Sequence, residues 1–545
     1  MERRPLRGAE DLFQRATGKF YTPVWMALQM ADRILDMLGS NLAAYQVVDP
    51  FAGDGRLLVA LMERIANEER WRRTEWNFEA WDTDESALSM ARVKLSESAR
   101  TLGLRAKLRI RRRDSFLESR DEFGKFDLVV TNPPWESLKP DSRELRGLWT
   151  RDRQRFVMGM RDYDRRLAVE LPNSQPATKL YGWGTNLSRC GLEVTVKLMR
   201  SGGCCGIVLP SSLLADQISA PLRRWVFSRM VVQSIDYYPA EAKPFDGVDQ
   251  PCVVMVGQRD ETGVGLDPVI LRHDRERKEI ARERIRLCPK HLEALEFRLP
   301  VELCAKELQL LLKLVRFKPL SDWESLRGGP FWMGRELDET GFHSFTGSSG
   351  EFAFIKGRDI TRFGAVHCYK DFVTPGAREI PASARTQRVA WRDVARRSQA
   401  RRMVATLIPA GVVTGNSLHV ASCANDGQDR LYALLGIINS LVFEFQLRSR
   451  LGTGHVSIGA VRGVRVPDLN DSVLVKMLSR LVKAALDGEE MAEARIETVI
   501  ADAFSLSRDD RGVLLKHFHG LSAQLEAELR TTFGFGAIGE EEIIA

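Results

Sequence analysis

A short motif of polar and aromatic residues, "NPPW", follows the apolar run "FDLVV" and joins Asn132 to two prolines and Trp135. Proline lacks a backbone N–H and fixes its own φ angle, so Pro133 and Pro134 form a stiff corner that offers carbonyl acceptors and no donors. The Asn132 side-chain oxygen and the Pro133 carbonyl can each accept one proton of a planar amine, while Trp135 offers a stacking face. This motif therefore predicts a site that activates an amine by positioning alone. A proline corner with a buried tryptophan is the purely structural alternative.

A glycine-bearing turn follows an earlier apolar run, in "VVDPFAGDGRLL". It places Asp49, Gly53 and Gly55 between an expected strand and an expected helix. Glycines let the backbone approach a ligand, and a helix N-terminus presents free N–H groups. The acid in the middle of the turn, Asp54, disfavours a phosphate ligand and suits the ammonium group of a zwitterionic amino acid. A tight turn without any ligand is the alternative.

Acidic residues also end the next two apolar runs. In "AWDTDES", Asp82 lies where an acid grips ribose hydroxyls, whereas Asp84 fits the N-cap of the following helix and leaves Asp82 free. In "RRRDSF", Asp114 can accept a hydrogen bond from an adenine amine or cap a turn. The three turns together fit a nucleoside with an amino-acid tail, and S-adenosylmethionine is such a molecule.

The elements that must position these motifs alternate between strands and helices. The pattern predicts a helix over 24–39, strands that end at the four motifs, and later strands at 204–210, 231–238 and 250–258. Such alternation favours a Rossmann-like α/β fold, with a mostly parallel sheet and helices on both faces. Ligands then bind at the carboxyl ends of the strands, where the motifs lie.

Composition excludes several classes of protein. The chain has 545 residues, of which 44% are hydrophobic and 28% are charged. This length and composition predict a globular protein of more than one domain. No apolar stretch approaches the roughly 20 residues of a membrane span, and the N-terminus lacks the apolar core of a signal peptide. The eight cysteines show no metal-like spacing. We therefore expect a cytoplasmic protein without a metal site.

The order of "FYTP", "DPFAGDG", "RDSF" and "NPPW" resembles the gamma arrangement of DNA adenine-N6 methyltransferases, in which the cofactor motifs precede the catalytic motif. The second half resembles a TaqI-like specificity domain, through 352–363, 431–440 and 461–469. The resemblance implies S-adenosylmethionine as cofactor, double-stranded DNA as substrate, and methyl transfer to N6 of a flipped-out adenine. It implies a modification enzyme of a restriction-modification or phage-defence system, with a separate restriction endonuclease or defence-system subunits as candidate partners.

The resemblance also assigns residues. For the cofactor it implies Thr22 at the methionine carboxylate, Asp49, Ala52, Gly53 and Gly55 around the methionine part, Asp82 at the ribose, Asp114 at the adenine amine, and Ser115 beside it. For catalysis it implies Asn132, Pro133, Pro134 and Trp135, with Trp135 and Phe245 sandwiching the target base.

The formal net charge of the chain is +7, and the segment 316–468 alone carries an excess of seven basic over acidic residues. The segment Arg385–Arg402 holds seven arginines and one acid, Asp393. The segment predicts a strand followed by a basic loop that contacts DNA phosphates. A solvated charged surface is the alternative. The candidate DNA-binding residues are Arg396, Arg397, Arg401 and Arg402, with Arg450 and His455 in a glycine-rich loop.

The expected domains are a methyltransferase domain at 1–258, a connecting segment at 259–317, an α+β target-recognition domain at 318–470 and C-terminal helices at 471–545. Two rival functions stay open. The same motif suits an RNA or protein-glutamine amino-methyltransferase, and the chain could be a catalytically weak DNA-binding module. The length of the second half argues against a protein-directed methyltransferase. The intact cofactor and catalytic motifs argue against a catalytically weak DNA-binding module.

Overall fold

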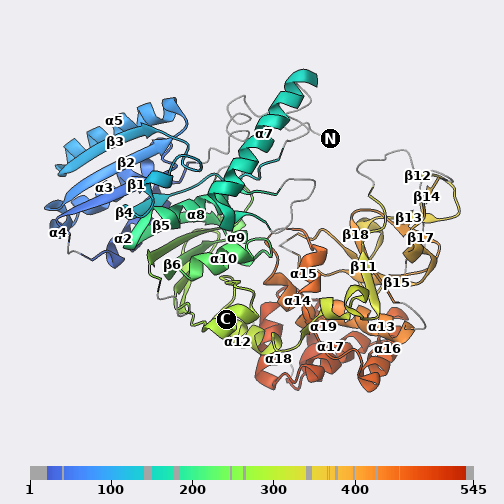
Figure 1. The fold of residues 1–545 in the computed structure, drawn as a ribbon. Coiled ribbons are helices and arrows are strands. Elements are labelled where there is room, and N and C mark those ends of the chain that lie inside the picture. Colours follow the sequence, from blue (N-terminus) through green and yellow to red (C-terminus); the bar gives the residue numbers. More distant parts are fainter. Residues whose placement is uncertain are drawn as a thin grey trace, which may run out of the picture. The chain divides into compact units, whose positions relative to one another are not determined.

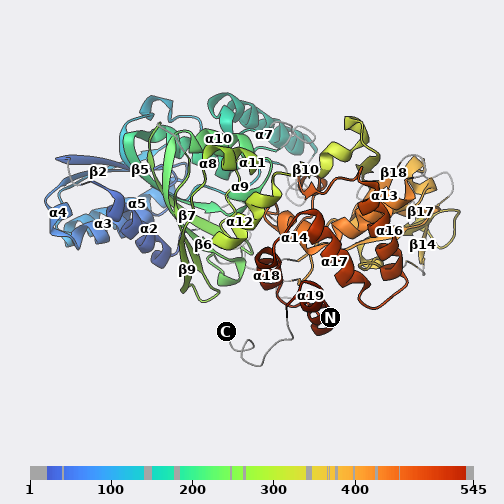
Figure 2. The same ribbon diagram turned by 90° about the horizontal axis from the view of Figure 1, so that it is seen from below.

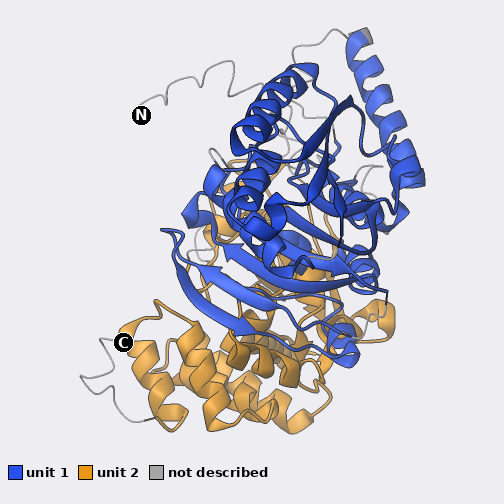
Figure 3. Ribbon diagram, turned by 90° about the vertical axis from the view of Figure 1, so that its left-hand side faces the viewer, with its two compact units in different colours: residues 1–302 blue, residues 303–545 orange. Residues whose placement is uncertain are grey.

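The computed structural model describes residues 21–39, 42–139, 150–176, 184–245, 248–261, 265–338, 346–364, 366, 369–374, 379–396, 399–423, 427–452 and 454–535. The chain forms two compact units, residues 1–302 and 303–545 (Figure 3). The division falls after Glu302, and not at the expected boundaries of 258 and 317.

Unit 1 is built on a nine-stranded sheet with the order β3-β2-β1-β4-β5-β7-β6-β8-β9 (Figure 1). Strands β1 to β5 are mutually parallel, β7 is antiparallel to both of its neighbours, and β8 continues parallel to β6. This confirms the expected mostly parallel sheet. The strands are β1 (Ala44–Asp49), β2 (Glu75–Asp82), β3 (Ala106–Arg112), β4 (Phe126–Thr131), β5 (Met199–Pro210), β6 (Met230–Tyr238), β7 (Cys252–Arg259), β8 (Val269–His273) and β9 (Glu279–Arg284).

The first part of the expected connecting segment, residues 259–268, joins β7 to β8 within this sheet. Its glycines and acids make a connection between strands, and they do not separate domains. Unit 1 therefore continues through β8, β9 and the short helix α11 (Pro289–Ala294).

Helices cover both faces of the sheet because the strand order reverses direction after β3. Right-handed crossovers place α3 (Arg56–Ala66) and α5 (Glu85–Leu102) on one face, and α8 (Leu187–Leu198) and α10 (Ala220–Phe227) on the other. The N-terminal helix α2 (Val24–Met37) packs on α3, β5 and β7. The reversal leaves a crevice at the carboxyl ends of β1 and β4, where ligands bind in such folds.

Helix α2 is held close to the sheet by a glycine. Its buried face includes Met30 and Ile34, and a Cβ atom at Gly206 of β5 would lie only 2.7 and 2.5 Å from their side chains. Any larger residue at Gly206 would displace α2, and with it the Tyr21–Pro23 segment that leads into the helix. This packing therefore fixes the position of Tyr21–Pro23, which belongs to the "FYTP" motif, relative to the sheet.

The basic and polar insertion after "NPPW" contains a long helix, α7 (Thr150–Glu170), which extends away from the sheet in Figure 1. Its residues 152–156 are all exposed, whereas Asp164 and Leu167 near its C-terminus are buried. The C-terminal half of α7 is therefore the part that packs on the domain.

Unit 2 combines two four-stranded sheets with a group of helices (Figure 2). One sheet has the order β11-β18-β15-β16 and the other β12-β14-β13-β17. Helix α16 packs on α13, and α17 packs on α14, so the C-terminal helices share a core with the preceding domain. The strands are β10 (Lys318–Pro319), β11 (Phe331–Gly334), β12 (Thr346–Gly347), β13 (Ala353–Ile355), β14 (Asp371–Val373), β15 (Arg388–Arg392), β16 (Ala405–Ile408), β17 (Val412–Thr414), β18 (Leu418–Cys423) and β19 (Arg465–Val466). The helices are α12 (Ala305–Leu314), α13 (Gln428–Ile438), α14 (Leu441–Arg448), α15 (Ile458–Arg462), α16 (Ser472–Leu486), α17 (Ala492–Ala503), α18 (Arg508–His517) and α19 (Ala523–Thr532).

Among the described residues, no single helix is long and apolar enough to cross a membrane; by length and composition alone, the bent pair α13–α14 passes that test.

Candidate active site

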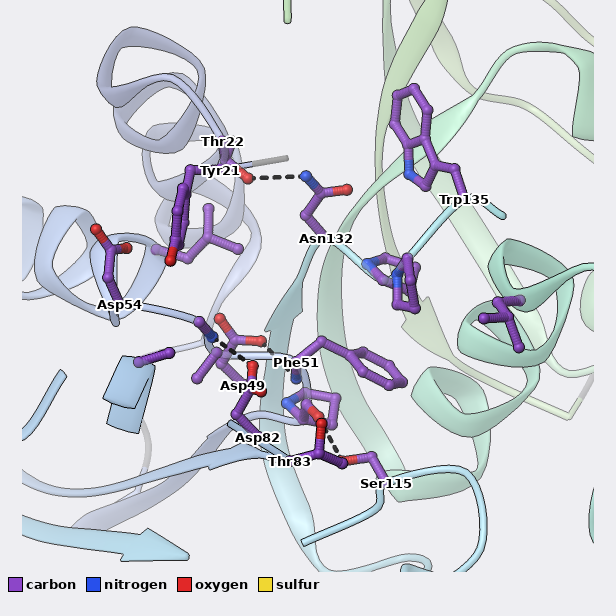
Figure 4. A pocket seen from close by; sticks show the side chains of 18 of the residues that line it. Tyr21, Thr22, Asp49, Phe51, Asp54, Asp82, Thr83, Ser115, Asn132 and Trp135 are labelled. Carbon is purple, nitrogen blue, oxygen red and sulfur yellow. Dashed lines mark hydrogen bonds between the residues drawn. The ribbon is translucent and has the colours of Figure 1, made fainter. Parts of the chain in front are cut away.

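A cavity of about 270 Å³ lies at the carboxyl ends of the strands in unit 1 (Figure 4). It brings together residues from the turns after β1, β2, β3 and β4, as the sequence predicted. All of the residues assigned to cofactor and catalysis line it except Gly55: Thr22, Asp49, Ala52, Gly53, Asp82, Asp114, Ser115, Asn132, Pro133, Pro134, Trp135 and Phe245.

Both glycines of the first turn have left-handed backbones, with φ of 52° at Gly53 and 81° at Gly55. A Cβ atom at Gly53 would lie 3.1 Å from the ring of Tyr21, and one at Gly55 would lie 3.1 Å from the Cβ of Ala91 in α5. Gly53 thus admits Tyr21 to the cavity wall, while Gly55 lets α5 approach the turn. Gly55 therefore shapes the site without lining it.

Asp49 ends β1 and is fully buried. Its Oδ1 accepts a hydrogen bond from the backbone N–H of Phe51 at 3.1 Å, whereas its Oδ2 is buried without a hydrogen-bond partner among the described residues. Burial raises the pKa of Asp49 to about 7, and the Phe51 N–H offsets only part of that effect. A buried carboxylate oxygen of this kind in a cavity wall suits a cationic ligand group.

Asp82 is not free, contrary to the expectation from sequence. Its Oδ2 accepts a hydrogen bond from the Gly53 N–H and its Oδ1 accepts one from the Asp84 N–H, each at 2.9 Å. Asp84 does cap α5, as expected, by accepting from the Ser86 N–H. An ionised carboxylate has about four lone-pair sites, so Asp82 can brace the glycine turn and still accept bonds from two hydroxyls.

Asp114 has a neighbour that the sequence did not reveal. Its Oδ1 accepts from the Phe116 N–H at 3.0 Å, and its Oδ2 accepts from the hydroxyl of Tyr163 in α7 at 3.1 Å. Burial raises the pKa of Asp114. The inserted helix therefore contributes a wall to this end of the cavity. Ser115 is buried here and donates to the Pro50 carbonyl, which ties the third turn to the first.

The Asn132 amide is oriented by Thr22. Asn132 Nδ2 donates to Thr22 Oγ1 at 3.1 Å, and Figure 4 shows the Asn132 oxygen on the side of Trp135. The expected role of Thr22 was contact with a carboxylate, so its bond to Asn132 is a new observation. The side-chain oxygen of Asn132, which is the acceptor expected from "NPPW", is consequently turned away from Thr22.

Trp135 and Phe245 meet in the cavity, but they do not form the expected sandwich. Their ring centroids lie 5.1 Å apart with an interplanar angle of 80°, an edge-to-face contact that leaves no room for a base between them. A flat base between two parallel faces needs the rings about 7 Å apart. One ring must therefore move before a base can stack between them.

Helix α8 fixes the other side of "NPPW". Its N-cap, Asn186, donates to the Trp135 carbonyl at 3.2 Å. Further along, a Cβ atom at Gly191 would lie 2.2 Å from the Cβ of Pro133, so only glycine lets the helix pack this closely. Gly191 is a supporting residue that sequence reasoning missed, although a glycine in mid-helix was a usable signal.

Asp54 lines the cavity, but its carboxylate already has two basic partners that the sequence did not reveal. It is buried and paired with Arg56 Nη2 at 2.8 Å and with Lys94 Nζ at 2.6 Å. These hydrogen bonds and charges outweigh burial and lower the pKa of Asp54. One acid between two bases leaves a net positive charge beside the cavity.

The candidate DNA-binding residues separate into two groups in unit 2. Arg401 pairs with the buried Glu444 at 2.8 Å, while Arg402 and Arg450 are 5% and 8% exposed, so the structure contradicts their assignment to phosphates. Arg396 and His455 have exposed side chains, and Arg397 lies outside the described residues.

An exposed basic hollow of about 350 Å³ lies next to that second group. Lys356, Gly357, Arg358, Arg392, Val394 and Ser417 line it. Val394 forms an isolated β-bridge with His455, and Arg396 follows two residues later. Lys356, Gly357 and Arg358 lie within 352–363, one of the segments that resemble a TaqI-like specificity domain.

Within the described residues, no group of three or more His, Cys, Asp or Glu side chains could hold a metal ion. The mostly parallel central sheet resembles that of S-adenosylmethionine-dependent methyltransferase folds.

Comparisons with known proteins agree with this fold. Residues 11–154 match the model of the N-6 DNA Methylase family. The chain is 24% identical over 238 residues to the Type II methyltransferase M.VspI of Vibrio sp. (strain 343), a match that covers 44% of this chain and 47% of that protein. The chain thus spans about half the length of this curated relative.

Two solved structures share the fold over most of the chain. The Type IIL restriction-modification enzyme MmeI, in complex with DNA, matches with a TM-score of 0.55 and 12% identity, over 98% of this chain and 76% of that chain. A nuclease-deletion mutant of the Type ISP enzyme LlaGI, in complex with a DNA substrate mimic, matches with a TM-score of 0.54 and 11% identity, over 88% and 47%.

Proposed function

We propose that this protein transfers a methyl group from S-adenosylmethionine to N6 of an adenine in double-stranded DNA. It would serve as the modification enzyme of a restriction-modification or phage-defence system. The observation that carries the proposal is the arrangement of Asn132, Pro133 and Trp135 in one cavity with the buried carboxylate of Asp49. The match to the N-6 DNA Methylase family, which includes these residues, supports it.

The residues present fit the cofactor. Asp49 Oδ2 suits the ammonium of the methionine part, Gly53 allows the backbone to approach it, and Asp82 retains lone pairs for ribose hydroxyls. When bound, S-adenosylmethionine supplies an electrophilic methyl group. Asp114 lies at the end of the cavity reached by Tyr163, where an adenine amine would complete its hydrogen bonds.

The catalytic part of the chain acts on the target amine. Asn132 Oδ1 and the Pro133 carbonyl would each accept one amine proton and so aim the nitrogen lone pair at the methyl carbon. The nitrogen would gain the methyl group as the methyl–sulfur bond breaks, the sulfur would leave as a neutral thioether, and the nitrogen would afterwards release one proton to water, so no strong base is needed. The adenine would have to leave the duplex stack to reach this cavity, and Trp135 would stack on it after its contact with Phe245 opens.

Cofactor binding should depend on pH through Asp49. We expect affinity for S-adenosylmethionine to increase between pH 6 and 8, because the carboxyl group, with its pKa raised to about 7, must ionise to pair with an ammonium. Calorimetric titration across this range measures the effect, and Asp49→Asn should bind weakly with a flat profile. An equally steep profile in Asp49→Asn would contradict the assignment.

The same pKa affects stability without any cofactor. A carboxyl group with a pKa higher in the folded than in the unfolded protein contributes stability that is present below pH 4 and is lost as pH rises through 7. The free energy of unfolding of the wild type, relative to Asp49→Asn, should therefore fall between pH 4 and 7. Denaturant titrations at several pH values test this sign.

The basic hollow and its surroundings are the surface that we propose for phosphate contacts. Arg358 and Arg396 are exposed, whereas Arg401 and Arg402 are committed to the interior. Replacing Arg358 and Arg396 by alanine should weaken DNA binding and reduce the slope of log affinity against log salt by about 2, or about 0.9 per lost phosphate contact.

The matched control removes two charges elsewhere in unit 2. Lys476 and Arg480 are exposed on α16, and their replacement by alanine should leave the salt slope unchanged. Equal salt slopes for the two double variants would mean that the basic hollow is an ordinary solvated surface and does not contact phosphates.

A transfer assay with radiolabelled S-adenosylmethionine tests the proposed function. The purified protein should label duplex DNA, and nuclease digestion should recover the label as N6-methyladenine. Label in RNA or in protein glutamine, with unlabelled DNA, would overturn the proposal in favour of another amino-methyltransferase. Absence of label in every substrate would favour the alternative that the protein is a catalytically weak DNA-binding module.

A further inference from the structure

Three charged residues hold the segment before α2 against the glycine turn. Asp54 accepts two bonds from Arg56, from Nε at 2.9 Å and from Nη2 at 2.8 Å, and one from Lys94 Nζ at 2.6 Å. Asp54 is 4% exposed, whereas its two basic partners are partly exposed to water. Asp54, Arg56 and Lys94 are called the clamp below.

The clamp reaches the residue that contacts the catalytic motif. Arg56 Nη1 donates to the backbone carbonyl of Thr22 at 3.2 Å, and its guanidinium lies 4.6 Å from the centre of the Tyr21 ring. The side chain of Thr22 then accepts from Asn132 Nδ2 at 3.1 Å. A continuous path of hydrogen bonds therefore runs from Asp54 through Arg56 and Thr22 to Asn132.

We infer that the clamp makes Thr22 a positioning residue for Asn132, an inference that rests on the proposed function. An amide can present either its oxygen or its nitrogen to a substrate, because the two ends have nearly the same shape. A hydrogen bond that engages Nδ2 leaves Oδ1 to accept an amine proton. The clamp keeps Thr22 in place, and Thr22 keeps the oxygen of Asn132 turned toward the substrate.

This role explains the acid in the glycine turn. A small residue there would leave Arg56 and Lys94 without their buried partner, and Arg56 would lose the support that directs it to Thr22. A displacement of about 1 Å at a reacting group costs up to about 100-fold in rate. The clamp thus acts on the rate of the chemical step through a residue that need not touch the substrate.

The test is single-turnover methyl transfer at saturating cofactor and DNA. Thr22→Val, which keeps the shape but removes the hydroxyl, should lower the rate constant by about 10- to 100-fold. Thr22→Ser should restore it to within about threefold, because it returns the acceptor. Thr22→Ala serves as a second variant if Thr22→Val does not fold, as judged by thermal unfolding.

Helix α3 offers a matched pair for the clamp itself. Arg56→Gln should slow the same step, whereas Arg64→Gln, which removes a partly exposed pair between α3 and Asp32 of α2, should not. An unchanged rate constant in both Thr22→Val and Arg56→Gln would overturn the inference. So would a Thr22→Val variant whose only defect is a higher cofactor Kd, since that would mean direct cofactor contact. A wild type that methylates no substrate would overturn the proposed function instead.

Discussion

Asn132→Ala should lower methyl transfer by about three orders of magnitude while the protein stays folded and binds S-adenosylmethionine with near-normal affinity. The variant removes the only side-chain acceptor in "NPPW", and the loss of one preorganised hydrogen-bonding group at a reacting centre costs about 10²–10³-fold. Because Asn132 is assigned to the target amine, ground-state cofactor binding should be unaffected. Steady-state kinetics and calorimetric titration measure the two properties separately.

Asn132→Asp provides the control for this prediction. It keeps an oxygen acceptor but loses the Nδ2 group that donates to Thr22. Its rate should fall between those of the wild type and Asn132→Ala. Activity of Asn132→Ala within tenfold of the wild type would contradict the catalytic assignment.

Glu336→Ala should destabilise unit 2 by about 3–5 kcal/mol, because it leaves the buried Arg388 without its counter-charge. Both side chains are fully buried and are joined by Nε–Oε1 and Nη2–Oε2 bonds of 2.7 and 2.9 Å. The remaining guanidinium protons go to backbone carbonyls, two of them at Thr386 and Pro409. Chemical denaturation, followed by circular dichroism, measures the loss.

Two controls show whether the unpaired charge is the cause. Glu336→Leu combined with Arg388→Met removes both charges and should recover part of the stability, the rest being lost with the bonds that Ser383 and Thr414 donate to Glu336. Asp322→Ala removes the partner of the exposed Arg327 and should cost less than about 1 kcal/mol. Equal losses for Glu336→Ala and Asp322→Ala would contradict this account of the buried pair.

The site was largely predictable from sequence because each motif is local and each follows a strand. Once the strands are parallel, their carboxyl ends converge, so Asp49, Asp82, Asp114 and Asn132 had to meet at one edge. The residues that orient them come from distant parts of the chain. Thr22 lies 110 positions from Asn132, and no periodicity links the two.

The arginine-rich segment shows where composition fails. Arg388 and Arg401 belong to the same run as Arg396, yet the first two pair with buried glutamates and the third is exposed. A count of charges cannot tell which side chains point inward, because partners from distant parts of the chain decide this. The acids that capture them, Glu336 and Glu444, lie 52 and 43 positions away.

The aromatic pair marks a similar limit. The sequence placed Trp135 and Phe245 in one pocket, and the structure confirms that they meet. Their edge-to-face contact depends on tertiary packing, which no short motif encodes.

We propose that the protein methylates adenine in DNA and that Asn132 holds the target amine during the transfer. The most direct measurement is expression in a host without adenine methylation, followed by genome-wide mapping of modified bases. The account predicts N6-methyladenine at one short recurring sequence in cells with the wild type and none in cells with Asn132→Ala. Folded wild-type protein in cells whose DNA contains no modified adenine would contradict it.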